Sequence, residues 1–362
     1  MPLSCSVFDD VTIVPFQQKD SETSYACYDC HGNPIYEGMQ LRYETLSFAL
    51  APLETVETVE TLAYHSAIFG GVFFHHFGHF LLETLGRLWF AKKHPHIPII
   101  FIAHNAYILD FEKEILSLLE ITNKIYFVDR QIKVNQLFIP EAGYCIPNTF
   151  DESHRCFLSV YKPGETISGK KIYLSRRHFG GESSITNEDE LEKLVMEYGY
   201  TVVYPEEHSV SEQLELLGSA ETVLAIEGSA LHSLILLESV SAHVLIIPRP
   251  GQSASLNYTT IAIKKNIKQT YIPIKNLYSS VKPTESGSVY FRATLNLDLF
   301  RRYLELPSWN RAHMIVLSQS YSKKEEMDPK ILTLNAYRKI KKENSILKKE
   351  LNIYKKIIDQ KK

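Results

Sequence analysis

The spacing of apolar and polar positions is most regular between residues 171 and 274. Short runs of β-branched and aromatic side chains predict buried strands at residues 171–174, 201–204, 222–226, 243–247 and 269–274. Between these runs, apolar side chains recur every three or four positions, which predicts helices at residues 188–198, 209–217 and 230–238. Strands that alternate with such helices form a parallel sheet covered on both faces. The pattern therefore predicts a doubly wound α/β domain.

The N-terminal half has a less regular pattern. Runs with strand character occur at residues 8–15, 33–60, 98–102, 124–128 and 136–139. A stretch rich in aromatic residues and leucine predicts a helix over residues 73–90, and a second helix is expected at residues 111–119. These elements indicate a second α/β unit. We expect the linker between the two units within residues 161–170, because proline, serine and two glycines interrupt the pattern there.

Polar residues follow two of the predicted parallel strands. Arg176 and Arg177 come directly after the first strand of that sheet, and Gly228 and Ser229 follow the third. Ligands of open α/β sheets bind at the carboxyl ends of strands, where helix N-termini present N–H groups to anions. Arginine suits phosphate oxygens, and glycine lets the backbone approach closely. The sequence predicts a diphosphate site; the alternative is a solvated arginine pair beside an ordinary helix cap.

Several segments together resemble glycosyltransferase family 61: residues 171–177 (KIYLSRR), 187–191 (NEDEL), 199–206 (GYTVVYPE) and 227–231 (EGSAL). Residues 76–83 (HFGHFLLE) are similar to the histidine segment that the family has ahead of an apolar helix. The resemblance covers residues 65–275 and is to the bacterial form, linked to capsular and other surface polysaccharides. It implies a GT-B architecture of two facing Rossmann-type domains, a nucleotide-sugar donor held mainly by the C-terminal domain, and inversion at the anomeric carbon.

On this basis the chain divides into four regions. These are an acceptor-side α/β domain at residues 1–165, a nucleotide-sugar-binding Rossmann-type domain at 166–288, a closing helical segment at 289–322 and a helical tail at 323–362. The expected reaction transfers a hexosyl or pentosyl group from a nucleotide-diphosphate donor to a glycan or lipid-linked acceptor, in the synthesis of capsule, lipopolysaccharide or a related surface glycan. We expect no metal, cofactor or nucleic acid to take part.

The chain departs from the family pattern at three places. Glu227 stands where the family often has histidine, Ser233 stands where asparagine often follows, and Ser183 and Ser184 occupy a region that usually holds a second arginine. A carboxylate beside a diphosphate is repulsive unless it faces hydroxyl groups, so we assign Glu227 to the recognition of ribose or sugar hydroxyls. The departures also support a second hypothesis, a catalytically inactive GT-B scaffold that binds glycan or a partner transferase.

Histidines and a carboxylate cluster near the start of the predicted helix at residues 73–90. His75 and His79 are four residues apart, as are His79 and Glu83, so on a helix each pair shares one face. A histidine backed by a carboxylate is an oriented base, and an inverting transferase needs a base for the acceptor hydroxyl. His79 and Glu83 are therefore the candidate catalytic residues, with packing at the helix entry and a metal site as alternatives. Arg249, after the fourth parallel strand, is a further candidate for donor contact.

Composition agrees with an intracellular enzyme. The chain has 362 residues, of which 44% are hydrophobic, enough to build the cores of two domains. Its first residues (MPLSCSVFDD) lack the features of a signal peptide, and no apolar run approaches the ~20 residues that span a bilayer. We expect a cytoplasmic protein, located in the cytosol or at the inner face of the plasma membrane. The five cysteines are then expected to be free thiols.

The last forty residues differ in charge from the rest of the chain. Residues 323–362 contain 13 basic and 6 acidic side chains, a net charge of +7; since the whole chain carries −3, the preceding residues carry −10. Apolar residues and one asparagine recur at heptad spacing: Tyr337, Ile340, Asn344, Leu347, Leu351, Tyr354 and Ile358. Three interpretations remain open, namely a homodimer through residues 330–360, a basic helix on an anionic membrane surface, and a solvated appendage.

Overall fold

A computed structural model describes residues 2–19, 22–43, 45–54, 59–147, 149–179, 185–250, 255–272, 277–283 and 291–305. All of these residues belong to one compact unit. The predicted tail helix at residues 323–362, with its dimer and membrane alternatives, lies outside the described residues. Ser183 and Ser184 lie outside them too, as does the segment at 289–322 apart from one strand and one helix.

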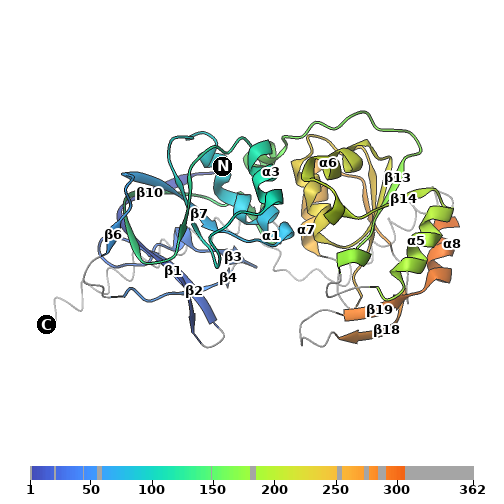
Figure 1. Ribbon diagram of the computed structural model, residues 1–362, viewed down its shortest axis with the longest axis horizontal. Helices are drawn as coiled ribbons and strands as arrows, with labels where there is room; N and C mark the ends of the chain where they lie inside the picture. Colours follow the sequence, from blue (N-terminus) through green and yellow to red (C-terminus); the bar gives the residue numbers. More distant parts are fainter. Residues whose placement is uncertain are drawn as a thin grey trace. The chain divides into compact units, whose positions relative to one another are not determined.

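The C-terminal half contains the predicted parallel sheet (Figure 1). Its strands, in spatial order, are β14 (Tyr200–Val203), β13 (Lys171–Leu174), β15 (Thr222–Ile226), β16 (His243–Ile247) and β17 (Gln269–Tyr271). Every neighbouring pair in this sheet runs parallel. The doubly wound prediction for this region is confirmed, and three of the strands have the predicted bounds.

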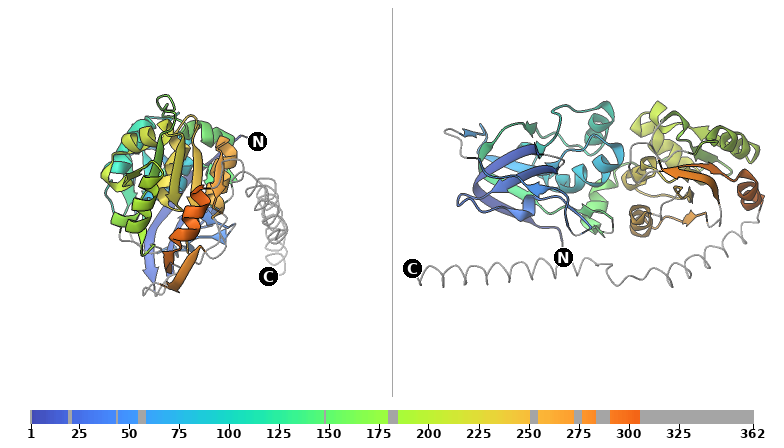
Figure 2. Two further views of the ribbon diagram at one scale, coloured as in Figure 1. Left: turned by 90° about the vertical axis from the view of Figure 1, so that its right-hand side faces the viewer. Right: turned by 90° about the horizontal axis from the view of Figure 1, so that it is seen from below.

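Helices cover both faces of this sheet, as Figure 1 and the right-hand view of Figure 2 show. They are α5 (Glu188–Glu197), α6 (Val210–Ser219), the 3-10 helix η5 (Ser229–Leu236), α7 (Leu256–Lys265) and α8 (Leu297–Glu305). Successive side chains of a strand point to opposite faces. Ile172 and Leu174 accordingly pack with α6, η5 and α7, whereas Tyr173 packs with α5 and α8. Gly199 ends α5 with a φ of +80°, the left-handed conformation expected of a glycine cap.

The N-terminal half contains a mixed sheet. It is built from β1 (Cys5–Lys19), β2 (Glu22–Tyr28), β5 (Ala49–Leu50), β6 (Glu60–Thr61), β7 (Ser66–Val72), β8 (Ile99–Ile102), β9 (Ile125–Val128) and β10 (Ile132–Pro140). Strands β10, β7, β8 and β9 are parallel, as in a Rossmann-type sheet, but β1 pairs antiparallel with both β10 and β2. The N-terminal half thus combines helices with a sheet that is parallel only in part, and its separation as a domain of its own stays a prediction.

The helix predicted at residues 73–90 is interrupted. Strand β7 ends at Val72, and the chain then forms α1 (Phe77–Leu82), the 3-10 helix η2 (Thr84–Arg87) and α2 (Leu88–Ala91). The Thr84 hydroxyl accepts a hydrogen bond from the Phe74 N–H at 2.9 Å and contacts the Val72 carbonyl at 3.2 Å. Side-chain bonds of this kind compete with regular helical bonds. They tie the end of β7 to the helical segment, so no single helix forms.

Shorter elements complete the described fold. They are η1 (Tyr36–Gly38), β3 (Leu41–Arg42), β4 (Thr45–Leu46), α3 (Asp110–Leu118), β11 (Tyr144–Cys145), β12 (Thr149–Phe150), α4 (Glu152–Leu158), η3 (Arg177–Phe179), η4 (Pro205–Glu207), β18 (Tyr278–Pro283) and β19 (Phe291–Leu295). The cysteines are free thiols, as predicted. Within the described ranges, no helix has both the length and the apolar character needed to cross a membrane.

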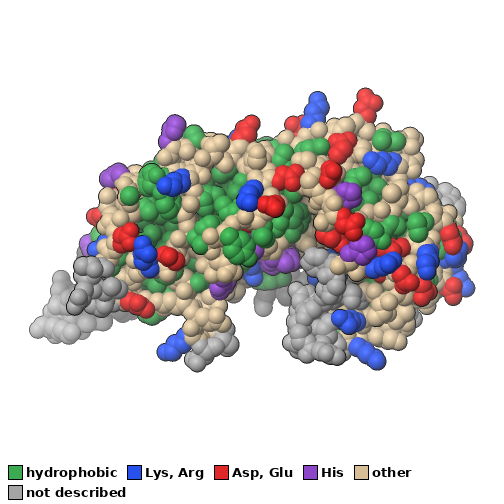
Figure 3. Space-filling view, viewed as in Figure 1, with side chains coloured by type: hydrophobic (Ala, Val, Ile, Leu, Met, Phe, Trp, Pro, Cys, Tyr) green, Lys and Arg blue, Asp and Glu red, His purple; other side chains and the backbone are tan. Residues whose placement is uncertain are grey.

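One apolar core joins the helices of both halves. It includes side chains of α1, α2 and α3 together with those of α6, η5 and α7. The Glu114 carboxylate of α3 also accepts hydrogen bonds at 2.8 Å from the N–H groups of Val210 and Ser211, which open α6. Figure 3 shows apolar side chains gathered over the N-terminal sheet and helices, and charged side chains interspersed over α5. This core holds α1 against η5, where the candidate site forms.

Candidate functional site

A pocket opens where the order of the parallel strands reverses. From β13 the chain crosses to β14 on one side and later to β15 on the other, and ligands of doubly wound folds bind at such a point. The pocket is lined by the ends of these strands and the loops after them: Leu174, Ser175, Arg176, Pro205, Glu206, Ala225, Ile226, Gly228, Ser229, Ala230 and Leu231. Arg176, Gly228 and Ser229, predicted from the sequence, therefore share one cavity.

Arg176 lies against the backbone of Gly228. A Cβ atom at position 228 would overlap the Arg176 Nη1 atom, so the glycine makes room for the guanidinium. Burial lowers the pKa of Arg176, and the positive charge of Arg249 lowers it further. Arg249 is held by a hydrogen bond from its Nε to the Glu227 carbonyl at 2.9 Å. Two guanidinium groups thus approach the same loop, which favours binding of an anion there.

The acidic residues that begin α5 hold the Arg176 loop in place. Glu188 is buried, and its Oε1 atom accepts hydrogen bonds from the Arg176 N–H and the Tyr173 hydroxyl, both at 2.7 Å, and from the Ser175 hydroxyl at 3.2 Å. Burial raises the pKa of Glu188. The preceding Asn187 pairs with both the carbonyl and the N–H of Leu295. This segment therefore positions the pocket and lies outside its lining.

Arg177 lies on the other side of the same loop. Its Nη1 forms an ion pair at 2.7 Å with Glu192 of α5, and its side chain is half-exposed. Glu192 is buried and also accepts a hydrogen bond from the Ser175 hydroxyl at 2.7 Å. Arg176 lines the pocket and Arg177 does not. Of the two predicted arginines, the geometry favours Arg176 for a ligand and Arg177 for holding the loop against α5.

Glu227 is buried beneath the loop that it begins. Its Oε1 atom accepts a hydrogen bond at 3.0 Å from the N–H of Ser255, the N-cap residue of α7. Among the described residues, its Oε2 atom has no hydrogen-bond partner. Burial raises the pKa of Glu227, although the Ser255 N–H and the charge of Arg249 oppose this. Glu227 is absent from the pocket lining. Its predicted role in hydroxyl recognition stays a prediction, and its observed contact is with α7.

The predicted pair of His79 and Glu83 forms on the N-terminal side. The His79 Nδ1 atom is 2.5 Å from the Glu83 Oε2 atom, and the Glu83 side chain is fully buried, whereas 38% of the His79 side chain is exposed. Arg42 donates to both Glu83 oxygens, at 2.7 and 2.8 Å, and Gln40 donates to Oε1 at 3.0 Å. Burial would raise the pKa of Glu83, but hydrogen bonds from His79 and Arg42 outweigh it and lower the pKa.

This network distinguishes the two candidate bases. Glu83 is ionised, buried and engaged by three side chains, so it is poorly suited to accept a proton from a substrate. With its Nδ1 proton held by Glu83, His79 can accept a proton on Nε2. The geometry therefore favours His79 as the base and Glu83 as the residue that orients it. Arg42 and Gln40 were absent from the sequence-based site, since they lie about 40 positions away with no motif to connect them.

His75 does not share a helical face with His79, contrary to the prediction. Helix α1 begins at Phe77, so His75 lies before it. The His75 Nδ1 atom is 2.9 Å from the buried Glu112 carboxylate, and its ring stacks on Tyr107 with centroids 4.3 Å apart. Among the described residues, no group of three or more histidine, cysteine, aspartate or glutamate side chains is arranged to hold a metal ion.

The two sides of the site meet where α1 packs on η5. A Cβ atom at Gly78 would lie 2.9 Å from the His232 Nδ1 atom and 3.0 Å from the Ser229 Cβ atom. Burial lowers the pKa of His76, and the charges of His79, Arg249 and Arg176 lower it further. His76 is thus electrostatically coupled to both sides. It is the N-cap residue of α1.

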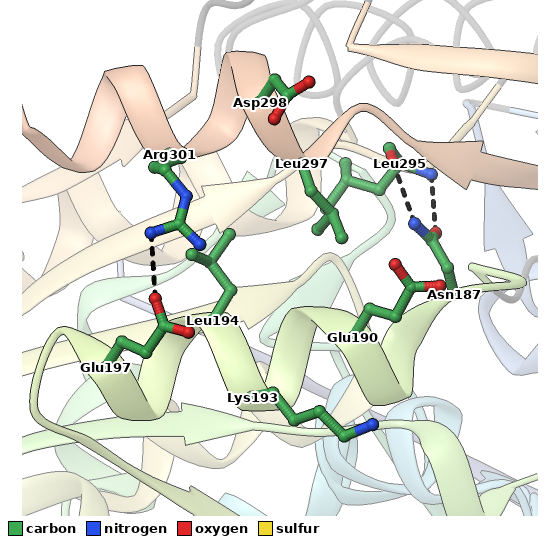
Figure 4. Close-up of a pocket in the computed structure, with 9 residues that line it drawn as sticks. All are labelled: Asn187, Glu190, Lys193, Leu194, Glu197, Leu295, Leu297, Asp298 and Arg301. Atoms are coloured by element: carbon green, nitrogen blue, oxygen red, sulfur yellow. Dashed lines mark hydrogen bonds and ion pairs between the residues drawn. The ribbon is translucent and has the colours of Figure 1, made fainter.

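His232 is buried in the core. Its ring stacks on Tyr258 with centroids 4.8 Å apart, and burial with nearby positive charges lowers its pKa to about 3. A second cavity, of about 460 Å³, lies between α5 and α8 (Figure 4). It is lined by Asn187, Glu190, Lys193, Leu194, Glu197, Leu295, Leu297, Asp298 and Arg301, and so contains none of the predicted site residues. The smaller pocket at the strand ends remains the candidate site.

Comparison with known families supports the same region. Residues 77–245 match the model of the family described as Glycosyltransferase 61. The match begins in α1, ends in β16 and includes His79, Glu83, Arg176 and Gly228. The resemblance to this family is therefore confirmed, whereas its bacterial, capsule-linked form stays a prediction. No curated protein matches the chain.

Proposed function

We propose that this chain, a glycosyltransferase of family 61, transfers a sugar from a nucleotide-diphosphate donor to a hydroxyl group of a growing surface glycan, with inversion at the anomeric carbon. The observation that carries the proposal is the juxtaposition of two chemically different groups where α1 meets η5. One is the arginine pair at the Gly228 loop, and the other is His79 with its buried carboxylate.

The arginine side suits the leaving diphosphate. Arg176 lines the pocket beside the start of η5, Arg249 adds positive charge from its bond to the Glu227 carbonyl, and Ser229 and the backbone N–H groups are further donors. Negative charge builds up on the diphosphate as its bond to the sugar breaks. Groups that are already positioned in a partly buried site stabilise such charge more strongly than water does. Arg176 is the principal donor-binding residue of this proposal, with Arg249, Gly228 and Ser229 around it.

The histidine side suits activation of the acceptor. The hydroxyl oxygen of the acceptor forms a bond to the anomeric carbon as the bond from that carbon to the diphosphate oxygen breaks. The hydroxyl proton passes to the Nε2 atom of His79, whose Nδ1–H is held by Glu83. The imidazolium that forms is stabilised by the Glu83 carboxylate. Because attack comes from the face opposite the leaving group, the product has inverted configuration.

The wider setting of the proposal is a GT-B enzyme of surface-glycan synthesis. The N-terminal α/β half carries the base and receives the glycan or lipid-linked acceptor, and the C-terminal half binds the donor. A cytoplasmic location, with the inner face of the plasma membrane as the site of the lipid-linked acceptor, fits this chemistry. Residues 330–360 would then add either a dimer contact or a membrane contact.

A screen of nucleotide sugars tests the proposal. The purified chain would be incubated with UDP-, GDP- and CMP-sugars, and both the melting temperature and the released nucleotide would be measured. We expect one class of nucleotide to stabilise the chain and its sugar to be hydrolysed or transferred, and Arg176→Ala to abolish both effects. Lack of stabilisation by every nucleotide would contradict the proposal.

The alternative is a catalytically inactive GT-B scaffold that binds glycan or a partner transferase. The carboxylate at Glu227 and the buried Ser233, whose hydroxyl lacks a partner among the described residues, are the observations behind it. Such a scaffold would bind glycan fragments without turnover of any donor. Mass analysis of the incubated sugars separates the two proposals, because only the enzyme forms a new glycoside.

A further inference from the structure

The pocket at the strand ends has two charged side chains of opposite sign. Arg176 follows β13, Glu206 follows the neighbouring β14, and the remainder of the lining is apolar or small. The apolar part includes Leu174, Ile226 and Leu231. A ligand that fits such a pocket carries an anionic group at one end and hydrogen-bond donors at the other. Its middle can rest on the apolar surface.

Glu206 differs from the two other carboxylates near this loop. Glu207 is bound to His178 Nδ1 at 2.7 Å, and Glu227 is buried and bonded to the Ser255 N–H. Glu206 is exposed, and it forms no hydrogen bond or ion pair with the residues that the structure describes. An ionised carboxylate only accepts hydrogen bonds. Glu206 is therefore the lining carboxylate that is available to a ligand with hydroxyl groups.

The backbone around Glu206 is held against the Arg176 loop. The His178 ring stacks on Tyr204, with centroids 3.9 Å apart and an angle of 8° between the planes, and the same ring binds Glu207. His178 belongs to η3, directly after the Arg176 loop, while Tyr204 and Glu207 flank Glu206. These contacts connect the two loops on the rim of the pocket. The backbone segments that carry Arg176 and Glu206 are thereby connected before any ligand binds.

We propose that Glu206 accepts hydrogen bonds from the ribose hydroxyls of the donor nucleotide. This inference rests on the proposed function, because it takes the ligand to be a nucleoside diphosphate. Its diphosphate is attracted to Arg176 and repelled by Glu206, while two adjacent hydroxyls can donate to one carboxylate. The two charges therefore set the direction of the nucleotide, with the nucleoside toward the end of β14 and the diphosphate toward η5. They also make the pocket selective for ribonucleotides.

Binding of deoxynucleotides tests this role. Dissociation constants of the full chain would be measured by calorimetry for UDP, GDP and CDP and for their 2′-deoxy and 3′-deoxy counterparts. We expect the ribonucleotide that binds best to bind about 10- to 100-fold more tightly than its deoxy forms, the range typical of a hydrogen bond to a charged group. In Glu206→Gln the preference should fall to a few-fold, while the affinity for the deoxynucleotides stays near that of the unaltered chain.

Glu207→Gln is the matched control, since it removes the same charge one position away and keeps a hydrogen-bond acceptor for His178. It should retain the full preference for ribose. The proposal is overturned if the unaltered chain binds ribo- and deoxynucleotides alike, or if Glu206→Gln keeps the preference at an unchanged melting temperature. Either result leaves the proposed function standing, because binding itself persists. Failure of every nucleotide to bind would overturn both.

Discussion

The two sides of the candidate site hold their reactive groups in different ways. On the C-terminal side, Arg176 is positioned through its backbone, whose N–H is bound by Glu188, and by the space that Gly228 leaves. On the N-terminal side, the His79 ring is oriented by side-chain contacts, with Glu83 bound to its Nδ1 atom and Arg42 bound to Glu83. The position of a group that is held through its backbone depends on the whole sheet, which many hydrogen bonds stabilise. A side-chain network depends on each of its members, so single substitutions should affect the two sides differently.

The largest effect is expected for His79→Ala. Loss of the proposed base should lower kcat by about 10²- to 10⁴-fold, the usual contribution of general base catalysis. Nucleotide affinity should be unchanged, because the donor groups lie on the other side of the site. Rate measurements at saturating donor, with calorimetry of nucleotide binding, separate the two quantities. The exposed His96→Ala is the control, and full kcat in His79→Ala would refute the role.

Arg176→Ala should act on the opposite side. We expect kcat/KM to fall by about 10²- to 10³-fold, comparable to the loss of one positioned donor to a developing negative charge. Arg176→Lys should restore only part of the activity, because a lysine offers a point charge in place of a planar fork. Arg301→Ala, which removes an exposed ion pair with Glu197, is the control. Equal nucleotide affinity in Arg176→Ala and the unaltered chain would contradict the proposed role of Arg176 in donor binding.

Arg42→Ala tests whether the N-terminal network depends on each member. It leaves the buried Glu83 with one fewer partner, which should lower the free energy of unfolding by about 1–3 kcal/mol. Arg130→Ala breaks an ion pair with Glu60 in which both side chains are more than half exposed, and should cost only about 0–1 kcal/mol. Urea unfolding of the two variants measures the difference. Similar losses would show that burial of Glu83 contributes little.

The smallest effect is a change in stability with pH. His154 is fully buried, and burial lowers its pKa from 6.5 to about 3. The unfolded chain binds a proton at this residue below pH 6.5 and the folded chain does not, so the contribution of His154 is complete above pH 6.5 and declines as the pH falls toward 3. The decline approaches about 1.4 kcal/mol per pH unit.

Urea unfolding between pH 7 and pH 5 compares the unaltered chain with His154→Phe. The variant should lose less stability on acidification, whereas the exposed His96→Gln should follow the unaltered chain. His232, whose pKa is also about 3, should behave like His154 but lies beside the site. An unchanged pH dependence in His154→Phe would mean that the buried ring does not resist protonation.

The C-terminal half was largely predictable because its signals are local. Short apolar runs such as residues 222–226 identify a buried strand, and Gly199 identifies the end of a helix. Parallel strands bring their carboxyl ends to one edge of the sheet, so the loops that carry Arg176 and Gly228 had to lie near each other. The motif at residues 187–191 was also visible, but its physical role was not. That Glu188 binds the Arg176 N–H depends on how α5 packs on the sheet.

The N-terminal half was less predictable because its decisive contacts join distant residues. The antiparallel pairing of β1 with β10 spans more than a hundred positions, and no periodicity encodes it. The helix predicted at residues 73–90 is interrupted by bonds between Thr84 and the end of β7. His75, which the spacing grouped with His79, is bound by Glu112 of α3.

By itself, the sequence determined the parallel sheet, the strand ends that form the pocket, and the pairing of His79 with Glu83, since each depends on spacing within one or two elements. Only the tertiary structure decided which arginine lines the pocket, that Glu83 is buried while His79 is partly exposed, and which carboxylate belongs to the pocket lining. These outcomes depend on partners such as Arg42, Glu192 and His178, brought close by packing of elements far apart in the chain. Hydrophobic periodicity specifies which face of an element is buried. It carries no information on which polar side chain of another element packs against that face.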